Sequence, residues 1–330
     1  MNTKYTTLIT MSGVLFLALG RAPLADAQRF IFTTIDYQNP IDHQSASSTH
    51  LGGVANNGEV VGFFFDQAGT AHGFLHSPSG TFSDPIDYVH ASVAGTFLYR
   101  IDSAGETIAG YYFDSATSVQ HGLVVELATN TYIPIDFLAA SGVQGTLLNG
   151  INKNGEVSGG YVDSAGTEHG FTANLNCLAQ TTCYQTIDFP GALETELEGV
   201  NDGGDLVGVY LSDKGRLVSF LLSGGAFTIL SAPGAAVIAR GINNFRHIVG
   251  FDENSIAFFA SQMGLSNGLR LGSSHGFLLT SPTAQAIPVD FPGADAHFDG
   301  VGSINDSGMM AGQYSSPGFV THGFLAVPTN

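Results

Sequence analysis

The sequence has little positive charge, few cysteines and no tryptophan. Its 330 residues include 10 Lys and Arg against 28 Asp and Glu, for a formal net charge of −18. Because no basic run could neutralise a row of phosphates, we expect neither nucleic acid nor an anionic membrane surface as a partner. Two cysteines cannot build a disulfide scaffold, and they lack the CxxC or histidine spacing of a metal site.

Long apolar segments are also scarce, and the main one lies at the N-terminus. Residues 1–27 have the pattern of a secretory signal peptide, with an early lysine, an apolar stretch from Leu8 to Leu19 and the small residues Ala25 and Ala27 at a cleavage site. A retained membrane anchor is the alternative, but the stretch is short for a span. We therefore expect a secreted or periplasmic protein that does not insert into the membrane once the signal is removed.

The two cysteines lie six positions apart in a polar segment. An oxidising compartment favours a disulfide between Cys177 and Cys183. So small a ring would clip one loop and stabilise the fold only locally.

Internal repetition is the strongest signal in the sequence. A His-Gly-Phe motif recurs with a period of about 49 residues, preceded by an Ile-Asn-x-x-Gly turn and followed by an Ile-Asp-Phe motif. The first position of the His-Gly-Phe motif and its variants is occupied in turn by His72, His121, His169, Val218, His275 and His322.

Each repeat predicts four short strands and no helix. In the third repeat the predicted strands are Thr146–Ile151, Glu156–Val162, His169–Ala173 and Tyr184–Phe189. Four antiparallel strands in a repeat of 40 to 50 residues are typical of a β-propeller blade.

The number of predicted strands indicates how the ring closes. The predicted repeats are 47–88, 94–137, 145–192, 194–235, 236–294 and 298–325. The last repeat lacks its fourth strand, and residues 30–37 form a fourth strand with no repeat before it. We therefore predict an all-β chain in which residues 28–330 form one six-bladed β-propeller, with four antiparallel strands per blade and the last blade closed by the N-terminal strand.

These motifs in combination resemble the HAF-repeat family of probable extracellular bacterial repeat proteins. The resemblance covers essentially residues 30 to 325, although this chain has Gly where the family label has Ala. It implies export and a repeated architecture, and it implies no specific activity.

The repeated His and Asp residues are spread around the ring and do not converge on one centre. We interpret them as structural pairs, each His bonding an Asp or a backbone group within its own blade. The acidic segment Asn201-Asp-Gly-Gly-Asp205 suggests calcium, but Asn-Asp-Gly is also what a tight hairpin turn requires. We therefore expect no metal and no cofactor.

Candidate binding residues are those where the repeats differ. Positions four and two before the isoleucine of Ile-Asn vary between repeats, and strand alternation turns both towards the central channel. A long loop in the fifth repeat, residues 253–274, is expected on the same face. The candidates are His50, Tyr99, Asn149, Glu196, Glu198, Arg240 and Arg270.

These candidate residues are compatible with a binding function, with an enzymatic function, and with a channel that binds nothing. We expect a non-catalytic module that binds an extracellular carbohydrate or protein at the channel mouth, with Arg240 contacting the ligand. The alternative is a secreted glycan hydrolase or lyase that uses Glu196 and Glu198 with His50 or Arg240. A water-filled channel without a ligand also fits the same residues.

Overall fold

The structure is a computed structural model that describes residues 29–41, 44–90, 92–230, 237–252, 274–292, 299–316 and 320–329. The predicted signal peptide and Arg270 lie outside the described residues. In the described part of the chain, no helix has the length and apolar character needed to cross a membrane.

The regular secondary structure of the described chain is β-strand, apart from two short 3-10 helices. The longest sheet contains β2 (Ser48–Val54), β3 (Val60–Phe65), β4 (Ala71–His76), β5 (Val93–Ile101), β6 (Thr107–Asp114), β7 (Val119–Glu126) and β8 (Thr131–Ile135). The next two sheets contain β9 (Gly145–Ile151), β10 (Glu156–Val162), β11 (Glu168–Asn174) and β12 (Tyr184–Thr186), then β13 (Glu194–Val200), β14 (Leu206–Leu211), β15 (Leu217–Ser223) and β16 (Ala226–Ile229). The remaining sheets contain β17 (Val237–Ile242), β18 (Ile248–Asp252), β19 (Gly276–Leu279) and β20 (Ile287–Pro288), then β21 (Asp299–Ile304), β22 (Met310–Ser316), β23 (Val320–Pro328) and β1 (Phe30–Ile35).

The seven-stranded sheet joins two sequence repeats. Strands β4 and β5 meet through one parallel residue pair, Ala71 and Gly95. Isolated bridges from Gly73 to Ile86 and from His76 to Phe82 place the segment after β4 along its outer edge, where a fourth strand is predicted. The sheet therefore contains a unit of β2 to β4 with this segment, and a second unit of β5 to β8.

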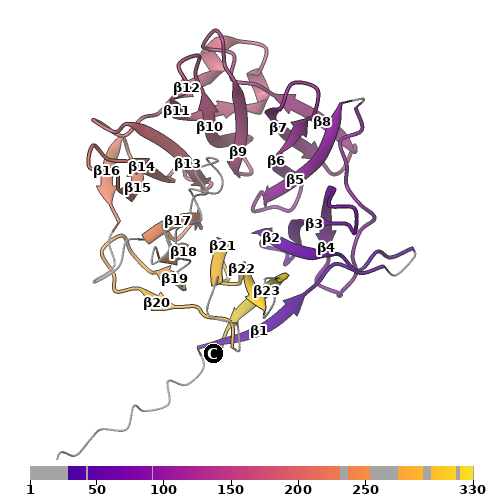
Figure 1. The fold of residues 1–330 in the computed structure, drawn as a ribbon. Coiled ribbons are helices and arrows are strands. Elements are labelled where there is room, and N and C mark those ends of the chain that lie inside the picture. The colour runs from indigo at the N-terminus through magenta and orange to yellow at the C-terminus, as the bar shows by residue number, and fades with distance from the viewer. Residues whose placement is uncertain are drawn as a thin grey trace, which may run out of the picture.

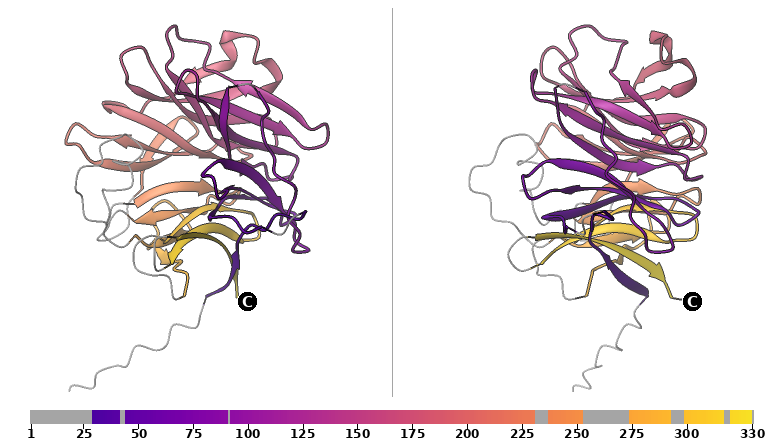
Figure 2. Two further views of the ribbon diagram at one scale, coloured as in Figure 1. Left: turned by 45° about the vertical axis from the view of Figure 1, so that its right-hand side comes forward. Right: turned by 90° about the vertical axis from the view of Figure 1, so that its right-hand side faces the viewer.

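The sheets are arranged around a common centre (Figure 1). The first strand of each repeat lies innermost, and β2, β5, β9, β13, β17 and β21 each contact the next, with β21 contacting β2. The inner strands thus form a ring that closes by contact, and the side view in Figure 2 shows the sheets stacked beside one another around it.

The two ends of the chain meet in one sheet. Strand β1 pairs antiparallel with β23 over six residue pairs, from Phe30 opposite Pro328 to Ile35 opposite Gly323. The ring of Phe32 packs on that of Phe324, with 5.6 Å between centroids. This is the pairing that the missing fourth strand predicts, and Figure 1 shows the indigo and yellow ends side by side.

The glycine of His-Gly-Phe lets neighbouring sheets approach. A Cβ on Gly170 would lie 3.0 Å from Cγ of Leu197 on the next inner strand, closer than ordinary packing allows. The fourth repeat has Ser219 at this position and Ala239 in place of the leucine, and the Ser219 hydroxyl accepts a hydrogen bond from the Ala239 amide at 2.9 Å. The larger residue is thus matched by a smaller partner in the next sheet.

The repeated His–Asp pairs are present within the sheets, as predicted. Their Nδ1-to-carboxylate distances run from 2.7 to 3.2 Å. The pairs are His72–Asp87, His121–Asp136, His169–Asp188, His275–Asp290 and His322–Asp36. The last pair joins the two ends of the chain, since Asp36 follows β1.

The disulfide is also present. Cys177 and Cys183 are bonded at 2.05 Å, between two short 3-10 helices, Leu175–Cys177 and Thr181–Cys183. It closes a single loop, as the spacing of the cysteines predicts.

Candidate functional site

Every inner strand has a bulge at the same place. The pairing register shifts at the residue two before the isoleucine of each Ile-Asn motif. These residues are Gly52, Tyr99, Asn149, Glu198, Arg240 and Gly302. A bulge adds one unpaired residue to the inner strand and increases its local twist.

A cavity of about 310 Å³ lies among the inner strands. Five of the candidate residues line it: His50, Tyr99, Asn149, Glu196 and Arg240. The structure therefore brings together residues that come from separate repeats.

Glu198 is the exception among the described candidates. Its side chain is fully buried, and both of its oxygens accept hydrogen bonds from Nη1 of Arg240, at 2.7 and 2.6 Å. The prediction that Glu196 and Glu198 project side by side into the channel is wrong, because Glu198 is turned into the protein, where it pairs with Arg240, and it does not line the cavity. Arg240 lines the cavity, but its charge already faces a carboxylate of the protein.

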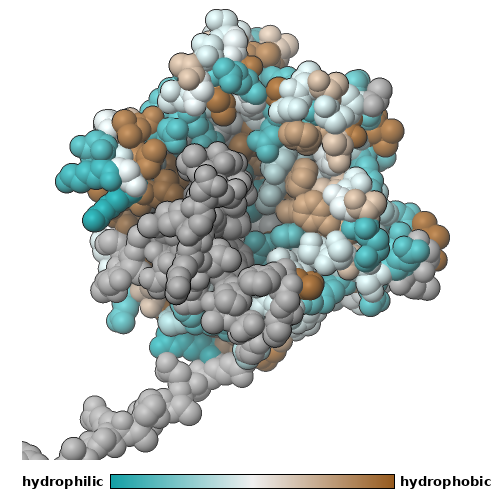
Figure 3. All heavy atoms as spheres, viewed as in Figure 1, coloured by the Kyte–Doolittle hydropathy of each residue, from teal (hydrophilic) through white to brown (hydrophobic). Residues whose placement is uncertain are grey.

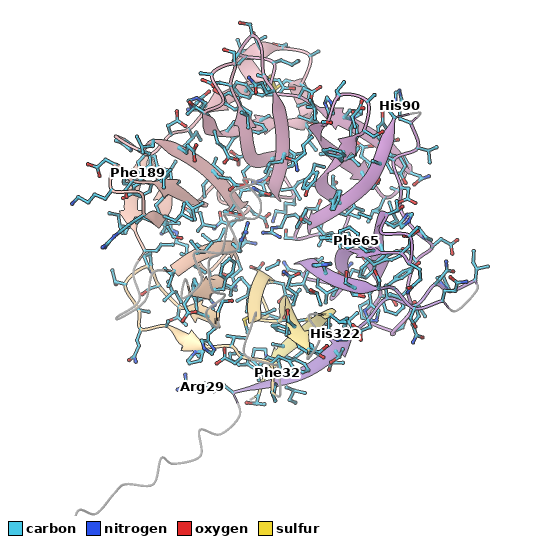
Figure 4. All side chains as sticks on the ribbon, viewed as in Figure 1. Arg29, Phe32, Phe65, His90, Phe189 and His322 are labelled. Carbon is cyan, nitrogen blue, oxygen red and sulfur yellow. A yellow bond between two sulfur atoms is a disulfide. The ribbon has the colours of Figure 1, made fainter. Side chains whose placement is uncertain are left out.

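One wall of the cavity is aromatic. The ring of Phe63 lies 5.2 Å from that of Phe97 and 5.1 Å from that of Tyr99, and the His50 ring stacks on it at 4.5 Å. Tyr111 stacks on Phe97 at 4.8 Å. Figure 3 shows hydrophobic residues on this face over β3 and β5, and Figure 4 places Phe65 towards the centre of the ring.

His50 and Tyr99 in this wall are among the residues predicted from the sequence, but Phe63 and Tyr111 are not. Phe63 and Tyr111 lie on second strands, each directly after a glycine in the middle of the strand. At the same position in other repeats, Phe251 and Gln313 also line the cavity. A Cβ on that glycine would collide with the carbonyl oxygen of the inner strand, as Gly62 would with His50. The residue after this glycine also varies between repeats, so the sequence pattern could have identified it as a candidate position.

The cavity also has polar lining residues. The Asn149 amide donates to Oε1 of Glu196 at 2.8 Å and to the Leu197 carbonyl at 3.1 Å. Nδ1 of His50 lies 2.8 Å from Oε1 of Gln313. Burial lowers the pKa of His50 to about 4, so this imidazole is neutral at physiological pH.

The Glu196 carboxyl is held in an unusual state. Burial raises its pKa well above the ordinary value, and the negative charges of Glu168 and Glu198 raise it further. The protonated form of Glu196 is therefore favoured to a higher pH than for an ordinary glutamate.

Arg100 is a second residue that the sequence analysis missed. It stands one before the isoleucine, where four other repeats have glycine. Its guanidinium donates to the carbonyls of Gly52 at 2.6 Å, Tyr99 at 3.0 Å and Arg240 at 3.0 Å. It also lines a smaller cavity of about 50 Å³ at the Ile-Asn turns, so Arg100 separates the two hollows on the axis.

The described residues offer no metal centre. Among them, no three His, Cys, Asp or Glu side chains lie close enough together to hold an ion. In the Asn201–Asp205 segment, Oδ1 of Asn201 accepts the amides of Gly203 and Asp205, and Arg246 pairs with Asp205 at 2.7 Å. These oxygens therefore serve a turn and an ion pair.

Known structures share the fold at low sequence identity. The fucose-recognising lectin of Aleuria aurantia, a six-bladed β-propeller, matches with a TM-score of 0.50 and 10% identity over 86% of this chain and 96% of its own. AofleA from Arthrobotrys oligospora matches with a TM-score of 0.52 and 11% identity over 89% and 86%. TolB from Acinetobacter baumannii matches with a TM-score of 0.50 and 10% identity over 78% and 59%.

No protein-family model and no curated protein matches the sequence. The HAF-repeat resemblance stays a prediction from the motifs. At such low identities the structural likeness shows the fold alone, which is that of a β-propeller.

Proposed function

We propose that this protein is an exported six-bladed β-propeller that binds a carbohydrate in its central cavity without transforming it. The six repeats, the closed ring of inner strands and the pairing of β1 with β23 support the blade count. The Cys177–Cys183 disulfide supports an oxidising compartment.

The two-sided lining of the cavity is the observation that carries the proposal. A sugar ring has apolar C–H faces that pack on aromatic rings and hydroxyls that need hydrogen-bond partners. The wall around Phe63, Phe97 and Tyr99 supplies the aromatic rings, and Asn149 with Glu196 in the same cavity supplies the hydrogen-bond partners. The volume of about 310 Å³ suits one sugar unit at the end of a chain.

The comparisons support the same function by analogy. The Aleuria aurantia protein is a lectin described as recognising fucose, and its fold is like this one. Analogy between folds does not carry a ligand across, so the sugar must be identified at this cavity itself.

A glycan-array screen of the protein, followed by calorimetry with the sugars that bind, tests the proposal. Tyr99→Ala removes part of the aromatic wall and should weaken binding about tenfold, or about 1.4 kcal/mol. Lys153→Ala is the control, since Lys153 lies in a turn at the opposite end of the ring axis, where it pairs with Asp202 at 3.3 Å. Equal losses in both variants, or no sugar bound at all, would contradict the proposal.

The glycan hydrolase or lyase is the second candidate, because Glu196, whose pKa is raised, lines the cavity and a second carboxyl, Glu198, lies on the same strand. The geometry disfavours it, since Glu198 is fully buried and bonded to Arg240 through both oxygens. Release of reducing sugar by the protein, lost in Glu196→Gln, would favour this candidate instead.

A further inference from the structure

The basic side chains around the cavity have partners within the protein, whereas one acidic side chain faces the open space. Arg240 is paired with Glu198, and Arg100 donates to three backbone carbonyls. His50 is neutral because burial lowers its pKa to about 4. The basic groups at the cavity are thus engaged within the protein, while the Glu196 carboxyl faces the open space.

A second carboxyl, that of Glu168, lies near Glu196 in the space beside Gly160. Where other repeats place Phe63 or Tyr111, the third repeat has Gly160. A Cβ on Gly160 would lie 2.8 Å from Oε1 of Glu168 and 3.5 Å from Cγ of Glu196. The missing side chain leaves room for two carboxyls from neighbouring sheets to approach each other.

Neither carboxyl is balanced by a cation in direct contact. Among the described residues, no hydrogen bond or ion pair is formed by the Glu168 carboxyl, and Glu196 accepts only from the neutral Asn149. The charged or titratable groups that act on this pair are Glu194, Glu198, His169 and Arg240. Burial raises the pKa of Glu168 to about 7, with a further contribution from repulsion by Glu194 and Glu198.

The aromatic wall and Glu196 line the same cavity. Burial raises the pKa of Tyr111, and Tyr99 and the charge of Glu196 raise it further. A carboxylate and several aromatic rings around one cavity are a favourable environment for an ammonium group, which is attracted by both.

We infer that the central cavity selects ligands that bear an ammonium group, and that within the carbohydrate function proposed above its ligand is an amino sugar with a free amine. The sugar ring of this ligand rests on the proposed carbohydrate function. Its amine is inferred from Glu196, Glu168 and the aromatic wall.

Binding of an amine at this site should release a proton. An ammonium group beside Glu196 favours the carboxylate, so the pKa of the carboxyl falls in the complex and a proton is released on binding. Affinity for the amine should therefore rise as the pH is raised from 5 to 7, while the ligand stays charged. Affinity for a neutral sugar should not follow this trend.

Calorimetry with glucosamine, glucose and choline at pH 5, 6 and 7 tests the inference. Glucosamine should bind at least about tenfold more tightly than glucose at pH 7 and should release protons, seen as a dependence of the heat on the buffer. Glu196→Gln is isosteric and should abolish both the preference and the proton release. Glu106→Gln, which makes the same change at an exposed turn on the opposite end of the axis, should leave both intact.

The outcomes separate the two proposals. Equal binding of glucose and glucosamine would overturn the amine inference and leave carbohydrate binding standing. Binding of choline that depends on Glu196, with no binding of any sugar, would support the cation site and overturn the carbohydrate function. If neither choline nor glucosamine is preferred over glucose, the inference is wrong.

Discussion

At the scale of single residues, the repeated histidines hold the third strand of a repeat to its fourth. His72 shows the arrangement: its Nδ1 lies 2.8 Å from Asp87, its Nε2 3.5 Å from Asp66, and its ring stacks on Phe64 at 5.2 Å. The hydrogen bond to Asp87 raises the pKa of His72, and the nearby charges of Asp87 and Asp66 add to this against the opposing effect of burial. Such a histidine stabilises the fold most when it is protonated.

His72→Gln should therefore lower stability in a pH-dependent way. A pKa raised in the folded state contributes stability that is fully present below the unfolded value of about 6.5 and is lost as the pH rises through the folded value. We expect a loss of about 1 kcal/mol at pH 5.5 and a smaller loss at pH 8.5. Thermal unfolding at both pH values measures it.

The control for this prediction is His90→Gln, at an exposed histidine outside the repeated motif. A loss of stability in His72→Gln that is the same at both pH values would contradict the charged pair.

At the scale of strands, one hydrogen bond recurs between neighbouring sheets. In four of the inner strands a threonine hydroxyl accepts the backbone amide that follows the Ile-Asp pair of the preceding sheet, as Thr49 does from Tyr37 at 2.9 Å and Thr146 from Phe137 at 3.0 Å. Tyr37 also stacks on Phe64 at 3.9 Å. The N-terminal segment thus completes the last sheet and anchors the first.

Deleting residues 28–38 should lower the stability of the whole protein by several kcal/mol. The deletion removes six residue pairs with β23, the Phe32 contacts and the buried Tyr37 ring, and it exposes the edge of β23. Denaturant unfolding and light scattering measure the loss of stability and the resulting aggregation.

Ile31→Thr, at an exposed position of the same strand, should change little. An unchanged unfolding midpoint and no aggregation in the truncated protein would contradict the closing role of β1.

At the scale of the whole molecule, Arg100 lies where strands from distant repeats converge. Its donors bind the carbonyls of Gly52, Tyr99 and Arg240, which belong to β2, β5 and β17. Burial lowers the pKa of Arg100 to about 10, so it stays charged at neutral pH. One side chain therefore joins three inner strands across the axis.

Arg100→Met should remove these bonds and leave buried carbonyls without a donor, at a cost of about 3 kcal/mol. Chemical denaturation measures the change, and Arg216→Met, at an exposed arginine, is the control. Similar small effects in both variants would show that water replaces the guanidinium without loss.

The sequence by itself determined the parts of this protein that depend on local and periodic patterns. In the third repeat the predicted strand Glu156–Val162 is β10, and the others differ from the structure mainly at their ends, because turn glycines and alternating apolar residues act within a few positions. The His–Asp pairs and the pairing of the chain ends also followed, since a repeat that lacks one strand must obtain it elsewhere.

Only the tertiary structure decided how the cavity is built. Glu198 is buried against Arg240 from the next inner strand, while Glu196 on the same strand as Glu198 lines the open space. Arg100 and the aromatic wall acquire their roles from strands that are far apart in the sequence and meet on the axis. A side chain's direction at a bulge, and its neighbours across a ring, depend on packing between repeats, which no single repeat encodes.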